Sequence, residues 1–146
     1  MNPVILTMPH GGTHFAMTVF DDVLGLDPRW AHFEPNAVPR IYRAMDDPAV
    51  RFFYVRRPDE LVAKSWEDRD RPREGFGRCL AIRNFMLCQI GHERLWLLDI
   101  NSPKQFASTC REFMRELGRP IPLEFEQMMR EWPVLRTKRL LAKKQL

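Results

Sequence analysis

The sequence predicts an α/β fold in which helices cover both faces of a small, mainly parallel sheet, a three-layer αβα arrangement. Two observations support this prediction. Short apolar, β-branched or aromatic segments alternate with longer segments whose apolar residues recur at helical spacing. Each short segment ends in turn-forming or polar residues, and a helix-like stretch follows it. Right-handed crossovers between parallel strands then place helices on both sides of the sheet.

The composition is that of an ordinary globular domain. With 146 residues we expect a single domain over residues 1–146, including a basic tail at about 134–146. Hydrophobic residues make up 45% of the chain and charged residues 29%. The net charge of +4 admits an anionic partner, but charges of both signs are interleaved, which disfavours nucleic acid as a partner.

The cysteines and the apolar runs indicate the compartment. Cys79, Cys88 and Cys110 lie in separate helix-like stretches and form neither a metal-ligand cluster nor a disulfide framework. We therefore expect buried thiols in a reducing compartment. No basic region precedes a long apolar run as in a signal peptide, and no apolar run approaches membrane-spanning length. These features predict a cytoplasmic protein without a membrane partner.

The chain opens with a strand, a tight turn and a helix. Residues 3–8 are a continuous apolar run that ends at Pro9, as expected of a buried strand. The following helix is expected over residues 13–24, with Thr13 as its N-cap and Gly25 as its stop.

A long connection and a second strand–helix pair follow. Residues 26–48 contain four prolines without strong periodicity, so we expect an irregular connection in which residues 37–45 can form a short helix. Residues 52–55 read as the second strand. A helix begins near Asp59, and residues 67–74 form a charged loop.

The second half repeats the alternation of helix and strand. A longer helix is expected at about 76–90, and a third strand at 95–98. Asn101 or Ser102 caps the helix that follows. A last helix is expected at about 123–132.

The end of the first strand offers groups that bind anions. Ligands of a parallel sheet lie at the carboxyl ends of its strands. There Gly11 and Gly12 let an anion approach the backbone, and His10, Thr13 and His14 add side-chain donors. The first N–H groups of the following helix are unpaired and point at the same turn.

The end of the second strand offers a second anion site. Arg56 and Arg57 follow this strand, and Ser65 lies two helical turns further along. An arginine can bind a phosphate through two parallel hydrogen bonds. Either arginine can serve this role. Two anion sites at neighbouring strand ends suit a ligand that carries phosphate-like groups at two places.

Three segments resemble, in order, motifs of the sulfotransferase family. Residues 9–14 (P-H-G-G-T-H) resemble the P-K-S-G-T-T or P-R-S-G-T-H loop, which binds the 5′-phosphosulfate of 3′-phosphoadenosine-5′-phosphosulfate (PAPS) in that family. Residues 54–66 resemble the V-R-D-P-R-D-V-x-x-S-W segment, whose Arg and Ser bind the 3′-phosphate. Residues 97–103, with residues 113–118, are similar to a late segment of the family.

The resemblance implies a P-loop-like sulfotransferase fold and the transfer of a sulfuryl group from PAPS to a hydroxyl or amine of a small-molecule or carbohydrate acceptor. It implies no metal, because arginines and backbone amides stabilise the negative charge of the donor. In several branches the base is a glutamate or histidine beyond the first helix, where His32 and Glu34 lie. His10 occupies the position of the family's loop cation, so these three residues are the candidate catalytic residues.

Departures from the family pattern leave alternatives open. His10 replaces the loop Lys or Arg, Gly11 replaces the loop serine, and the chain is short. A non-catalytic nucleotide- or anion-binding module of the same fold is therefore the main alternative to an enzyme. A small-molecule kinase is disfavoured, because no Lys-Ser or Lys-Thr pair follows Gly12. The sequence specifies neither the acceptor nor the oligomeric state.

Overall fold

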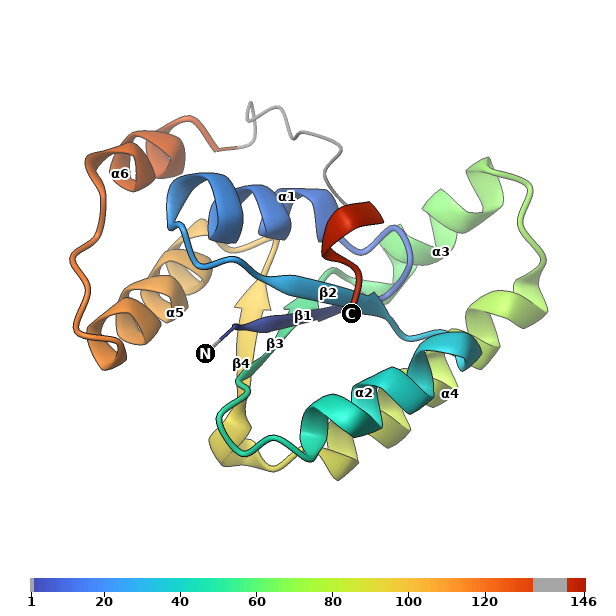
Figure 1. Cartoon of the computed structure of the whole chain (residues 1–146). Helices are drawn as coiled ribbons and strands as arrows, with labels where there is room; N and C mark the ends of the chain where they lie inside the picture. Colours follow the sequence, from blue (N-terminus) through green and yellow to red (C-terminus); the bar gives the residue numbers. More distant parts are fainter. Residues whose placement is uncertain (1, 133–141) are drawn as a thin grey trace.

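The computed structural model, which describes residues 2–132 and 142–146, contains a sheet of four parallel strands in the order β2-β1-β3-β4 (Figure 1). The central strand β1 (Val4–Thr7) pairs with β2 (Arg29–His32) on one side and with β3 (Phe52–Arg56) on the other. Strand β4 (Leu95–Asp99) pairs with β3 and forms the opposite edge. The prediction of an α/β fold with a small parallel sheet is confirmed.

Helices connect the strands and lie on both faces of the sheet (Figure 1). They are α1 (Thr13–Met17), which continues as a π-helical segment (Thr18–Val23), α2 (Val38–Met45) with a preceding 3₁₀ turn (Pro35–Ala37), α3 (Asp59–Asp68), α4 (Arg73–Gln89), a 3₁₀ turn (His92–Arg94), α5 (Pro103–Glu116), α6 (Leu123–Arg130) and a 3₁₀ turn (Ala142–Lys144). Most of the predicted basic tail, up to residue 141, lies outside the described residues.

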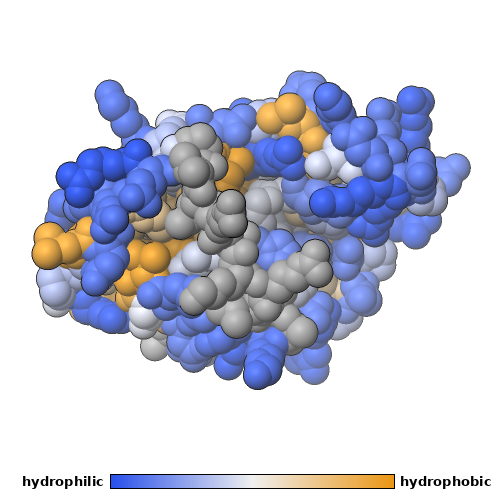
Figure 2. Space-filling model, turned by 90° about the horizontal axis from the view of Figure 1, so that it is seen from above, coloured by the Kyte–Doolittle hydropathy of each residue, from blue (hydrophilic) through white to orange (hydrophobic). Residues whose placement is uncertain are grey.

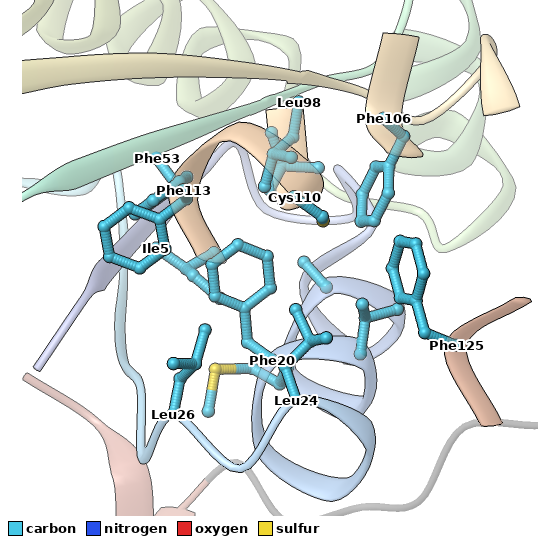
Figure 3. Close-up of a cluster of buried hydrophobic side chains, with 14 of the residues drawn as sticks. Ile5, Phe20, Leu24, Leu26, Phe53, Leu98, Phe106, Cys110, Phe113 and Phe125 are labelled. Carbon is cyan, nitrogen blue, oxygen red and sulfur yellow. The ribbon is translucent and has the colours of Figure 1, made fainter. Parts of the chain in front are cut away.

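Two apolar cores, one on each face, hold the layers together. Successive residues of a strand point to opposite faces, so Ile5 and Phe53 pack against α1, α5 and α6, whereas Leu6 and Phe52 pack against α2, α3 and α4. The first core is rich in fully buried aromatic side chains, and Figure 3 shows Phe20 among them. Both cores are continuous with the sheet, so the described helices and strands form three layers.

The irregular connection predicted over residues 26–48 contains a strand that the sequence reading missed. Arg29–His32 form β2, which runs parallel to β1 with His32 opposite Thr7. The strand is only four residues long and starts directly after Pro28, a position that an edge strand tolerates. The expectation of an irregular connection was therefore wrong here. Its consequence for the site is that His32 lies at the carboxyl edge of the sheet.

Two local predictions about caps had different outcomes. Gly12, not Thr13, occupies the N-cap position of α1, and Thr13 is the first helical residue. The predicted role of Thr13 as a cap was wrong because its hydroxyl group bonds to Thr7 and to His32 instead. Ser102 caps α5, since its Oγ accepts a hydrogen bond from the Gln105 backbone N–H at 3.3 Å.

The cysteines differ in their exposure. Cys79 and Cys110 are buried, as expected, and burial raises the pKa of the Cys110 thiol. Cys88 is exposed on α4, which contradicts the expectation of a buried thiol. Within the described part of the chain, no helix has both the length and the apolar character needed to cross a membrane.

Candidate functional site

A cleft of about 670 Å³ opens at the carboxyl end of β1. Its walls come from the loop after β1 and the start of α1, from the end of β2, and from α3 with the loop that follows it. The lining residues are Pro9, His10, Gly12, Thr13, His14, Phe15, His32, Glu34, Arg57, Ser65, Arg69 and Arg71. Over α3 and the loop after it, at the right of Figure 2, the surface is mostly hydrophilic.

The cleft brings together most of the residues that the sequence singled out. They are His10, Gly12, Thr13, His14, His32, Glu34, Arg57 and Ser65. Gly11 and Arg56 are not among the lining residues. Gly11 is buried beneath the turn, and Arg56 lines a neighbouring cleft of about 510 Å³ that Arg57 also borders.

The glycine pair is required by the shape of the turn. The Gly11 N–H donates to the Met8 carbonyl at 2.8 Å, and a Cβ atom on Gly11 would lie only 2.6 Å from the same oxygen. Gly12 has a φ of 95°, in the region that favours glycine. A Cβ atom there would also lie 3.1 Å from Ile100 Cδ1. The tight turn therefore places His10 and Thr13 on either side of the glycines at the cleft.

Arg57 and Ser65 meet beside this turn. Arg57 Nη1 donates to the His10 carbonyl at 2.7 Å and approaches Ser65 Oγ at 3.4 Å. The sequence left open which of Arg56 and Arg57 faces the loop. In the structure it is Arg57, which bonds to the His10 carbonyl and to Ser65 and lines the cleft.

Two further arginines come from the loop between α3 and α4. Arg69 Nη1 contacts His10 Nδ1, and Arg71 Nη1 lies 3.1 Å from His10 Nε2. The Arg71 guanidinium also lies over the Trp66 ring, 4.0 Å from its centroid. Sequence reasoning placed both arginines in a charged loop and gave them no role. Acidic residues outnumber arginines in residues 67–74, so composition does not mark this segment as an anion site.

Three arginines of the cleft have no carboxylate partner among the described residues. Among the described residues, none of Arg57, Arg69 and Arg71 forms an ion pair. By contrast, Arg83 pairs with Asp59 at 2.6 Å and Arg111 pairs with Glu126 at 2.9 Å. The cleft is therefore a concentrated positive site that is open to an anion.

His10 lies among these cations as a neutral group. Partial burial, followed by the charges of Arg69, Arg71 and Arg57, lowers the pKa of the His10 imidazole from its ordinary value of 6.5. At neutral pH the imidazole is therefore a hydrogen-bonding group, and the permanent cations of the cleft are the three arginines.

His32 and Glu34 lie at the opposite side of the turn, against Thr13. Thr13 Oγ1 lies 3.0 Å from His32 Nε2 and 2.6 Å from Thr7 Oγ1, and His32 Nδ1 lies 3.9 Å from Glu34 Oε1. Burial is the main cause that lowers the pKa of His32 to about 4, with smaller contributions from His10, Arg71 and His14. A neutral imidazole can accept one hydrogen bond and donate one, so Thr13 and Glu34 flank a ring that can relay a proton.

His14 lines the same cleft, and its ring nitrogen Nδ1 is buried. Its Nδ1 atom has no hydrogen-bond partner among the described residues.

The structure places no three His, Cys, Asp or Glu side chains of residues 2–132 and 142–146 where they could hold a metal ion.

Comparison of the chain with protein-family models, with curated proteins and with solved structures found no match.

Proposed function

We propose that the chain binds PAPS in this arginine-lined cleft and transfers its sulfuryl group to a hydroxyl or amine of a small-molecule or carbohydrate acceptor. The observation that carries the proposal is the convergence of Arg57, Arg69 and Arg71 on the loop of residues 9–14 without carboxylate partners among the described residues. Unpaired guanidinium groups gathered in a cleft repel one another, and a polyanionic ligand relieves that repulsion.

We assign the two ends of the donor to two neighbouring parts of the cleft. Arg57 and Ser65, 3.4 Å apart, offer a guanidinium and a hydroxyl group to the 3′-phosphate. We assign the phosphosulfate to the turn around Gly12, where Arg69 and Arg71 contact the ring of His10. This arrangement supplies permanent cations that do not depend on protonation of His10.

The transfer step requires a base on one side and cations on the other. The acceptor oxygen or nitrogen forms a bond to sulfur while the bond between sulfur and the bridging oxygen breaks, and the electron pair of that bond stays on the phosphate. Arg69 and Arg71 stabilise the charge that develops there. The acceptor proton passes to the Thr13 hydroxyl group while that group gives its own proton to His32 Nε2, and the Glu34 carboxylate near Nδ1 stabilises the imidazolium that forms. Burial is the main cause that lowers the pKa of His32, so a bound anion offsets only the smaller contribution of cations such as Arg71.

A non-catalytic module is the second candidate, and the lowered pKa values of His10 and His32 favour it. His10 is neutral where the resembling family has a cation, and burial makes His32 a weak base. Such a module would bind the same nucleotide in the same cleft and would not turn it over.

Calorimetry with adenosine 3′,5′-bisphosphate, the desulfated product, tests binding in both candidates. We expect saturable binding of the bisphosphate and weaker binding of ATP–Mg²⁺. Tight ATP–Mg²⁺ binding with no response to the bisphosphate would contradict the proposal.

Turnover separates the enzyme from the module. Formation of bisphosphate from PAPS is measured with a panel of hydroxyl and amine acceptors, for the native chain and for Glu34→Gln. Turnover that falls at least tenfold in the variant supports the enzyme. Binding without turnover for any acceptor supports the module.

A further inference from the structure

We propose that His10 is a positioning residue that holds Arg57, Arg69 and Arg71 as an arginine clamp, and that it acts as a hydrogen-bond acceptor and not as the cation of the loop. The inference deepens the proposed function and rests on it for the identity of the nucleotide. The clamp itself is a feature of the cleft that any compact polyanion can probe.

All three guanidinium groups of the clamp converge on this one residue. Arg57 donates to its backbone carbonyl, Arg69 contacts Nδ1, and Arg71 lies at Nε2. Among the described residues, His10 is the only side-chain hydrogen-bond partner of Arg69. Both loop arginines are exposed, and an exposed arginine loses much rotamer entropy when it is ordered. A fixed partner that contacts both side chains reduces that cost at the moment of ligand binding.

The backbone of His10 gives independent evidence of a functional role. Its φ of 64° lies in the left-handed region, which glycine adopts at far lower cost than histidine. In this conformation the carbonyl faces Arg57 while the ring reaches over to the loop arginines and packs edge-on against Trp66, with 5.7 Å between ring centroids. The turn alone would favour glycine at this position, so the imidazole serves something other than the turn.

The count of hydrogen-bond acceptors explains how the clamp stays available to a ligand. A neutral imidazole has a single acceptor nitrogen, whereas Arg69 and Arg71 each direct a guanidinium at one of its two nitrogens. One of the two guanidinium groups therefore lacks an acceptor on the ring. An anion with several lone pairs satisfies both groups at once and completes the clamp.

The effect of replacing His10 with lysine depends on whether His10 acts as a hydrogen-bond acceptor or as the loop cation, and the two roles predict opposite results. A lysine at position 10 would place a fourth positive charge among three guanidinium groups and would offer them no acceptor. If His10 instead stood in for a loop cation, a lysine would preserve or improve anion binding and transfer.

The test compares His10→Gly, His10→Asn and His10→Lys with the native chain, by calorimetry with inorganic pyrophosphate and with adenosine 3′,5′-bisphosphate. His10→Gly removes the ring and relieves the backbone, so we expect an unchanged or higher midpoint of thermal unfolding with pyrophosphate binding at least tenfold weaker. His10→Lys should also weaken binding at least tenfold. His10→Asn, which tolerates the left-handed conformation and keeps a side-chain acceptor, should recover part of the affinity.

Several outcomes overturn the inference: native-like pyrophosphate affinity in His10→Gly, native or higher affinity in His10→Lys, or no pyrophosphate binding by the native chain. The same measurements distinguish failure of the proposed function from failure of the clamp. Pyrophosphate binding that depends on His10, without any bisphosphate binding, supports the clamp and contradicts the nucleotide. Bisphosphate binding that is insensitive to all three variants supports the nucleotide and contradicts the clamp.

Discussion

Thr13 Oγ1 lies 3.0 Å from His32 Nε2 and so joins the first residue of α1 to the last residue of β2. Thr13 is buried, and its hydroxyl group also meets Thr7 Oγ1 at 2.6 Å. This contact fixes the ring of His32 at the edge of the cleft. It also explains why Thr13 does not cap the helix that it begins.

Thr13→Val keeps the side-chain shape and removes both hydrogen bonds. The Thr7 hydroxyl group and His32 Nε2 then lose their buried partner, so we expect a loss of about 1–3 kcal/mol in the free energy of unfolding. Urea denaturation measures this loss. Thr18→Val is the control, because among the described residues the Thr18 hydroxyl group bonds only to the His14 carbonyl, one helical turn away. Equal stabilities of the Thr13 variant and the native chain would mean that the contact does not hold the site together.

The stability of the fold should depend on pH through His32. Its pKa is about 4 in the folded chain against 6.5 for the ordinary imidazole, so between pH 6.5 and 4 the unfolded chain binds more protons than the folded chain. The free energy of unfolding should therefore fall as the pH falls through this range, by about 3 kcal/mol from this residue alone. Urea denaturation at a series of pH values measures the slope.

His32→Gln provides the comparison for this pH dependence. The variant lacks the titrating ring, so its stability should change less steeply between pH 6.5 and 4 than that of the native chain. Identical slopes would show that His32 is not the group that is kept neutral by burial.

The turn itself should be intolerant of side chains. Gly11→Ala places a methyl group 2.6 Å from the Met8 carbonyl oxygen, which belongs to the backbone and cannot move cheaply. We expect a loss of roughly 1–3 kcal/mol in the free energy of unfolding, as for other overpacked sites. Gly77→Ala in α4 is the matched control, since a Cβ atom there meets no described atom within 4 Å and alanine favours the helix by about 0.5–1 kcal/mol. A tolerated Gly11→Ala variant would contradict this geometry of the turn.

Local sequence patterns were enough to predict the frame of the site. The apolar run before Pro9, the glycine pair, and the spacing of eight residues between Arg57 and Ser65 are all short-range features. They depend on strand and helix periodicity, which a sequence displays directly. The parallel sheet and the position of the cleft at its carboxyl edge follow from the same periodicity.

The parts of the site that the sequence did not predict depend on tertiary structure. Strand β2 is short and follows a proline, so its pairing with β1 becomes visible only when the sheet is assembled. Arg56 ends β3 and lines only the neighbouring cleft, whereas Arg57 follows the strand and also lines the cleft at the turn. Arg69 and Arg71 reach His10 because the loop after α3 folds back, with the Arg71 N–H donating to the Trp66 carbonyl at 3.1 Å. The periodicity of the sequence does not encode this strand pairing or the directions in which these arginine side chains point.

The most direct test of a two-ended anion site compares Arg57→Ala with Arg56→Ala in calorimetric titrations with adenosine 3′,5′-bisphosphate. Arg57 bonds to the loop and to Ser65, whereas Arg56 lines the neighbouring cleft. We predict that Arg57→Ala weakens binding about tenfold to a hundredfold, as the loss of charge-assisted hydrogen bonds requires, and that Arg56→Ala changes it less than about threefold. Equal effects of the two substitutions, or a larger effect of Arg56→Ala, would contradict it.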